Sequence, residues 1–267
     1  MNGRFVTMKK IAVLFLCLLF VTLSFSVLAD DEIPDIVGKK LPDFTMTNTE
    51  GYQVTLSDLL RNYDAVAVNI FTSWCPPCRK EFPDMESVYR SMGDRIAIVA
   101  LTDEAEDTLE TIADYKAEMG LTFDMGLAAG TGVVEAINLD GYPTTMILDK
   151  SGTVCMYQSG YFAAEEAFEQ SMLAVSEGTD GSVRPILRQV FVTTNKDDPV
   201  PGAVVRFTGS SDYGGEAVTN SEGYCCFLQF GTPEKMTVEV VEAPGYDLSN
   251  ARETTSLYSS FSIFDLH

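Results

Sequence analysis

The chain has 267 residues, enough for two domains of ordinary size, and 46% of them are hydrophobic, as in globular proteins. Acidic residues outnumber basic ones by 39 to 18, and the formal net charge of −21 repels nucleic acid, so we expect no nucleic-acid partner. The single histidine is His267, which excludes Ser-His and Cys-His catalysis and histidine metal sites. Cysteine is left as the main carrier of chemistry.

Residues 1–29 have the pattern of a Sec-type signal peptide. Lys9 and Lys10 precede an apolar run from Ile11 to Ala29, and Val27-Leu28-Ala29 provides small residues at the positions that a signal peptidase reads. The run is also just long enough to cross a bilayer core of roughly 30 Å, so an uncleaved anchor remains an alternative. We therefore expect an extracytoplasmic protein, either secreted or tethered to the outer face of a membrane.

Between residues 34 and 178 the chain alternates strand and helix patterns, which predicts an α/β domain with a central sheet. Asp103 and Glu106 have capping-box spacing, so we expect a helix to open there and to end at Gly120. In chain order, the other expected elements are a hairpin at 43–47 and 53–56, a buried strand at 65–71, a helix after Cys78, a strand at 95–101, a hairpin at 144–149 and 153–158, and a helix from Ala163.

The most informative motif is Trp74-Cys75-Pro76-Pro77-Cys78, where the buried strand ends and a helix begins. Two cysteines at this spacing can close a disulfide and open it again, which moves two electrons. At a helix N-terminus, unpaired N–H groups and the positive end of the dipole favour the thiolate of Cys75. The alternative is half of a zinc site, but the chain has no second CxxC to complete it. We expect neither a metal nor an organic cofactor.

The segment from Asn69 to Pro83 resembles the active-site stretch of TlpA/ResA-like thiol-disulfide oxidoreductases, extracytoplasmic members of the thioredoxin superfamily. Leu41-Pro42-Asp43-Phe44 matches the opening of that family, and Gly141-Tyr142-Pro143-Thr144-Thr145 matches its cis-proline loop. The resemblance covers residues 34–175. It implies a thioredoxin fold, a redox-active Cys75–Cys78 disulfide facing a cis Pro143, protein disulfides as substrates and a membrane electron carrier as redox partner.

The same resemblance assigns roles to side chains. Cys75 would attack a substrate disulfide and Cys78 would resolve the mixed disulfide. The substrate would lie against Trp74, Tyr142, Pro143 and Thr144.

Glu81 occupies the position of a family carboxylate, three residues after Cys78, and could accept or return the proton of that thiol. The alternative is a solvated helix residue in the Arg79-Lys80-Glu81 run. Thioredoxins proper carry an aspartate six residues before the first cysteine. This chain has Asn69 there, which cannot serve as a base.

After a linker at 179–185, residues 186–267 show strands and turns without an amphipathic helix, which predicts a small β-sandwich. The expected strands are 186–193, 203–208, 224–229 and 236–242. Three segments resemble carboxypeptidase-regulatory-like and Cna-B-like prealbumin-type modules: Pro199–Val205, Thr219–Gly223 and Ala243–Tyr246. The lysine of a Cna-B isopeptide bond would fall at Val192, so we expect no such bond. The resemblance implies docking to a surface partner, not catalysis.

The remaining cysteines carry less weight. Cys155 lies within an expected strand and is predicted to be a core residue. Strand alternation places Cys225 on the inner face with Phe227 and directs Cys226 outward, and a vicinal disulfide between them remains an alternative.

These patterns together predict an extracytoplasmic thiol-disulfide oxidoreductase that reduces protein disulfides. One alternative is a surface adhesion scaffold in which the redox domain is secondary. Another is a peroxiredoxin-like antioxidant, which Thr72-x-x-Cys75 favours and which Val68, in place of the expected proline, disfavours.

Overall fold

The structure is a computed structural model that describes residues 35–137, 139–178, 184–209, 213–231, 235–255 and 261–267. The expected signal or anchor segment at 1–29 lies outside the described residues, as does most of the linker at 179–185. Within the described residues, no helix is long and apolar enough to cross a membrane.

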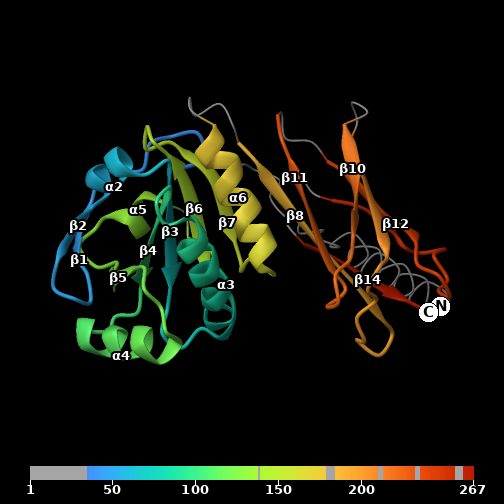
Figure 1. Ribbon diagram of the computed structural model, residues 1–267, viewed down its shortest axis with the longest axis horizontal. Coiled ribbons are helices and arrows are strands. Elements are labelled where there is room, and N and C mark those ends of the chain that lie inside the picture. Colours follow the sequence, from blue (N-terminus) through green and yellow to red (C-terminus); the bar gives the residue numbers. More distant parts are fainter. Residues whose placement is uncertain (1–34, 138, 179–183, 210–212, 232–234, 256–260) are drawn as a thin grey trace, which may run out of the picture. The chain divides into compact units, whose positions relative to one another are not determined.

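A five-stranded mixed sheet forms the centre of residues 35–178, with strand order β5-β4-β3-β6-β7 (Figure 1). Its strands are β3 (Ala65–Phe71), β4 (Ile96–Thr102), β5 (Asp124–Leu127), β6 (Thr144–Asp149) and β7 (Val154–Ser159). Strands β3, β4 and β5 are parallel, whereas β6 runs antiparallel to β3 and β7 runs antiparallel to β6. All seven residues of β3 are buried, as are all seven of β4, because both faces of the sheet are covered.

Helices and a hairpin cover the two faces of this sheet. They are α2 (Leu56–Asn62), α3 (Pro76–Met92), α4 (Leu109–Met119), α5 (Val133–Ala136) and α6 (Glu165–Glu177), with the hairpin β1 (Thr45–Thr47) and β2 (Gln53–Thr55). Helices α3 and α6 pack against each other on one face (Figure 1). Leu56 of α2 joins the apolar cluster of the other face. The arrangement is the thioredoxin fold that the sequence predicts.

Helix α4 begins five residues later than expected. Thr108 is the N-cap: its Oγ1 accepts a hydrogen bond from the backbone N–H of Thr111 at 3.2 Å, and the Thr111 hydroxyl oxygen accepts one from the Thr108 N–H at 2.9 Å. The predicted Asp103 cap is therefore wrong, and its carboxylate instead accepts a bond from the Tyr142 hydroxyl. Gly120 ends the helix in a left-handed conformation, with φ of 68°, as predicted.

The C-terminal part consists of strands, as predicted, arranged in two sheets of order β11-β8-β14 and β10-β9-β12-β13. The strands are β8 (Ile186–Thr194), β9 (Val204–Thr208), β10 (Gly214–Val218), β11 (Tyr224–Gln229), β12 (Thr237–Glu242), β13 (Arg252–Thr254) and β14 (Phe261–Leu266). A buried apolar cluster fills this part, with Val190, Phe207 and Val238 among its members. This is the core of a β-sandwich.

The sheet β11-β8-β14 also packs against the first part of the chain. Buried Leu187 of β8 and Tyr224 of β11 belong to the same apolar cluster as Phe82 of α3 and Phe168 of α6. The described chain forms one compact unit.

The cysteines outside the CxxC motif follow the predictions with one exception. Cys155 and Cys225 are buried, as expected. Cys226 does not point outward to solvent, because its Sγ lies 3.9 Å from Oε1 of Gln170 on α6. Cys225 and Cys226 are thiols in the structure, so the vicinal disulfide is not formed.

Candidate redox site

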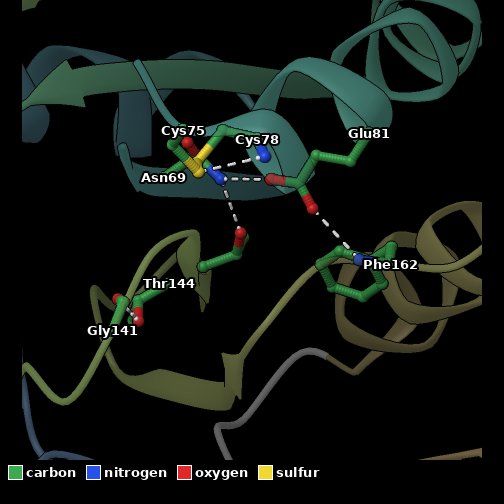
Figure 2. Close-up of a disulfide and its surroundings, with 8 residues drawn as sticks. Asn69, Cys75, Cys78, Glu81, Gly141, Thr144 and Phe162 are labelled. Carbon is green, nitrogen blue, oxygen red and sulfur yellow. Dashed lines mark hydrogen bonds between the residues drawn. A yellow bond between two sulfur atoms is a disulfide. The ribbon is translucent and has the colours of Figure 1, made fainter. Parts of the chain in front are cut away.

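A disulfide between Cys75 and Cys78 occupies the N-terminus of α3 (Figure 2). Cys75 is the N-cap residue, and its Sγ accepts a hydrogen bond from the backbone N–H of Cys78 at 3.1 Å. Pro76 and Pro77 fill the first two helical positions and have no N–H. The first N–H that the helix offers is therefore that of Cys78, and it is directed at the sulfur of Cys75.

Both cysteines are shielded in this disulfide form. Cys75 is 3% exposed and Cys78 is fully buried. The neighbouring Trp74 is 63% exposed and marks where the motif meets solvent.

Glu81 is fully buried, so the alternative of a solvated helix residue is wrong. Its Oε1 accepts a hydrogen bond from Nδ2 of Asn69 at 2.9 Å, and its Oε2 accepts one from the backbone N–H of Phe162 at 3.0 Å (Figure 2). Both carboxylate oxygens are thus held by amide donors rather than by a sulfur.

Burial raises the pKa of Glu81 to about 8, against the two hydrogen bonds, which favour the charged form. The charge of Asp84 on the same helix raises this pKa further. A carboxyl group with such a pKa exchanges its proton near neutral pH, which is what a proton donor or acceptor beside a thiol requires.

Asn69 is the residue that connects β3 to this carboxylate. It shares the α3-facing side of the strand with Ala67 and Phe71, and its Nδ2 also donates to Oγ1 of Thr145 at 2.8 Å. Sequence reasoning identified Asn69 only as a residue that cannot act as a base. The alternation of β3 could have shown that its amide faces α3.

The Tyr142–Pro143 peptide bond is cis, as the resemblance implies, and Pro143 is buried. Strand register brings this loop to the redox motif, because Thr144 pairs with Ile70 at the end of β3 from which the motif continues. The Thr144 hydroxyl donates to the carbonyl of Gly141 at 2.8 Å (Figure 2). The Thr144 side chain is fully buried and bonds within the loop.

Two aromatic side chains and two carboxylates form a rim beside the motif. Trp74 Nε1 donates to Oε2 of Glu104 at 2.5 Å, and the Tyr142 hydroxyl donates to Oδ2 of Asp103 at 2.7 Å. The Trp74 and Tyr142 rings meet edge to face, with centroids 6.1 Å apart. Burial has the largest effect on the pKa of Tyr142, and together with the bond to Asp103 it raises this pKa to about 12. Sequence reasoning missed the two carboxylates because it assigned that segment to a helix start.

No cluster of three or more His, Cys, Asp or Glu residues that could hold a metal ion occurs in the part of the chain that the structure describes.

Comparison with known proteins identifies the family. Residues 37–156 match the AhpC/TSA family. Over 156 residues the chain is 31% identical to the thiol-disulfide oxidoreductase ResA of Bacillus thuringiensis (strain Al Hakam). The aligned region covers 55% of this chain and 87% of ResA. The chain belongs to the ResA-like thiol-disulfide oxidoreductases.

Other relatives of this oxidoreductase match the same part of the chain. It is 32% identical over 118 residues to the thioredoxin-like protein YneN of Bacillus subtilis (strain 168), covering 44% of this chain and 68% of that protein. A solved thiol:disulfide interchange protein of the thioredoxin family, from Chlorobium tepidum TLS, is similar with a TM-score of 0.45 at 25% identity, covering 54% of this chain and 98% of the other. The AhpC/TSA match includes the CxxC motif and the cis-proline loop and ends before α6, so the C-terminal strands lie beyond it.

Proposed function

We propose that this oxidoreductase works outside the cytoplasm and reduces disulfides of other proteins with the Cys75–Cys78 dithiol. The observation that carries the proposal is the redox pair at the N-terminus of α3, where the Cys78 N–H points at the sulfur of Cys75 at 3.1 Å. A donor in this position stabilises negative charge on Cys75, the charge that an attacking thiolate and a leaving thiolate both carry.

In the first step the Cys75 thiolate attacks one sulfur of a substrate disulfide. A bond forms between Cys75 and that sulfur, the substrate S–S bond breaks, and the other substrate sulfur leaves as a thiolate that takes up a proton. Exposed Trp74 and the Tyr142–Pro143 loop are the surfaces on which we place the substrate backbone.

In the second step Cys78 loses its proton and attacks Cys75. The Cys75–Cys78 bond forms, the mixed disulfide breaks, and the substrate leaves with both of its sulfurs reduced. We assign the proton of Cys78 to Glu81, which lies one helical turn further along α3 and whose pKa of about 8 suits transfer from a thiol. The disulfide in the structure is the oxidised end of this cycle.

Each turnover consumes two electrons and two protons, so the oxidised protein needs a reductant. We propose a membrane dithiol carrier, which becomes a disulfide as Cys75 and Cys78 become thiols. The signal-like pattern of residues 1–29 supports an extracytoplasmic setting for this exchange, and the C-terminal sandwich offers a surface for a further partner.

The test is reduction of insulin disulfides with dithiothreitol as the electron source. The wild-type protein is expected to accelerate the reaction, Cys75→Ser to abolish the acceleration, and the control Cys155→Ala, which changes a buried cysteine of β7, to retain it. Equal activity of wild type and Cys75→Ser would contradict the proposal and favour the scaffold alternative.

A further inference from the structure

The C-terminal sheet contacts residues 161–163, the segment whose Phe162 N–H bonds to the Glu81 carboxylate. Gln189 of β8 is 1% exposed, and its side chain bonds to residues on both sides of Phe162. Its Oε1 accepts the backbone N–H of Ala163 at 2.8 Å, and its Nε2 donates to the backbone carbonyl of Tyr161 at 3.3 Å.

The Tyr161 carbonyl and the Phe162 N–H belong to one peptide group. One end of that group accepts from Gln189, and the other end donates to Oε2 of Glu81 at 3.0 Å. A hydrogen bond received at the carbonyl polarises the peptide and strengthens its N–H as a donor. Gln189 is therefore connected to the Glu81 carboxylate through a single peptide group.

Tyr224 of β11 extends this chain of hydrogen bonds. Its hydroxyl donates to Oε1 of Gln189 at 3.1 Å, and the residue is 1% exposed. An aromatic contact from the same sheet covers the segment, since the Tyr161 and Phe261 rings lie 5.7 Å apart. A fully enclosed amide with satisfied bonds has one arrangement, so the segment is held in place.

We propose that Gln189 is a positioning residue of the redox site: it holds the Tyr161–Phe162 peptide against Glu81, and so makes the C-terminal sheet a part of the oxidoreductase machinery. The inference rests on the proposed role of Glu81 in moving the proton of Cys78. It gives the C-terminal strands a function that the family match, which ends at residue 156, does not cover.

Few charged or titratable groups other than Glu81 itself could shift the midpoint of its titration. Asp84 of α3 and Tyr115 of α4 are the titratable side chains coupled to it, along with the thiols of the redox pair when reduced. Strand β3 contributes the neutral Asn69, and the 161–163 segment contributes backbone amides. The charges of Glu165, Glu222 and Lys80 shift the pKa of Asp84, so they affect Glu81 only through Asp84.

The test follows the ¹H and ¹⁵N shifts of the Phe162 amide against pH in the oxidised full chain, where Cys75 and Cys78 form a disulfide and do not titrate. In the wild type these shifts should report the ionisation of Glu81, with a midpoint near its pKa of about 8. Gln189→Met keeps the size of the side chain and removes both bonds to the segment. It is expected to raise the midpoint by about 0.5 to 1 pH unit, because a weaker donor stabilises the carboxylate less.

Two further variants separate positioning from general loss of stability. Tyr224→Phe removes the hydroxyl that bonds to Gln189 and also contacts Cys226, leaves both bonds from Gln189 to the segment in place, and should raise the midpoint by a smaller amount. Val190→Ala makes a cavity on the opposite face of β8, in the sandwich cluster, and should lower stability without moving the midpoint. An unchanged midpoint in Gln189→Met, or the same shift in Val190→Ala, would overturn the proposal. Because the titration needs no turnover, that result is distinct from a failure of insulin reduction in the wild type.

Discussion

Glu81 is the residue in which the competing forces of the redox site meet. Two amide donors stabilise its charge, whereas complete burial disfavours that charge and raises its pKa to about 8. The spacing of Glu81 after Cys78 predicts a role in proton transfer, but the sequence did not decide between that role and a solvated helix residue. The Phe162 donor lies 81 residues away along the chain, and no local sequence pattern predicts a contact between residues so far apart.

Replacing Glu81 by Gln should change how stability depends on pH. Below about pH 4.5, the ordinary pKa, the carboxyl is protonated in both the folded and the unfolded state, and between pH 4.5 and 8 it is protonated only in the folded state. The folded state therefore binds more protons in this window, and the contribution of Glu81 to stability is lost as pH rises, by at most about 1.4 kcal/mol per pH unit.

Glu81→Gln lacks this loss, so its free energy of unfolding relative to wild type should increase from pH 4.5 to 8. The Asn69 amide can accommodate the change, because its unpartnered Oδ1 can turn toward the new NH₂ group. Urea unfolding of both oxidised proteins at several pH values measures the difference. Parallel pH curves would show that Glu81 is already ionised when folded.

At the scale of elements, unbroken apolar runs predicted correctly where strands lie. Strands β3 and β4 are buried on both faces, so their sequences are nearly continuous apolar runs that are easy to identify. Strands β5, β10, β13 and β14 were not predicted. In β10 and β13 the side chains are mostly exposed and β10 opens with two glycines, so no apolar alternation marks them.

The start of α4 was misplaced for a different reason. Two acidic residues with the right spacing mimic a capping box, but the Asp103 side chain is engaged by Tyr142. The Thr108–Thr111 pair, which caps the helix in the structure, uses a threonine where the usual pattern has Glu or Gln.

Thr108→Ala is therefore expected to lower the free energy of unfolding by about 1 kcal/mol, because the backbone N–H of Thr111 loses its acceptor. Glu106→Ala, at the exposed position of the wrongly predicted box, serves as the control and should change stability by less than about 0.5 kcal/mol. Chemical denaturation of the two variants measures both values. A larger cost for Glu106→Ala than for Thr108→Ala would return the helix start to Asp103.

At the scale of the whole molecule, the sequence predicts separate domains at 34–178 and 186–267, divided where helical patterns end. The contact between them could not be predicted, because Leu187, Gln189 and Tyr224 follow ordinary strand alternation. Their partners are on α6 and in the 161–163 segment. The shared apolar cluster leads us to expect that the two parts unfold together.

Leu187→Ala tests this coupling. Removing a buried leucine from the shared cluster should cost about 2 to 5 kcal/mol. Trp74 is the only tryptophan of the chain, so fluorescence reports on the redox part alone, and its unfolding midpoint should fall although the substitution is in β8. Ile263→Ala, which changes a 65% exposed side chain of β14, is the control and should leave the midpoint in place. An unchanged Trp74 midpoint in Leu187→Ala would mean that the two parts unfold independently.

The central claim is that Cys75 attacks and Cys78 resolves, and trapping of the mixed disulfide tests it most directly. Each single variant is reduced, freed of reductant and mixed with an oxidised protein substrate, and the products are separated without reductant and identified by mass spectrometry. Cys78→Ser should accumulate a Cys75–substrate disulfide, because the thiol that resolves it is gone, whereas Cys75→Ser should accumulate none. Equal trapping by both variants, or trapping by Cys75→Ser alone, would contradict the account.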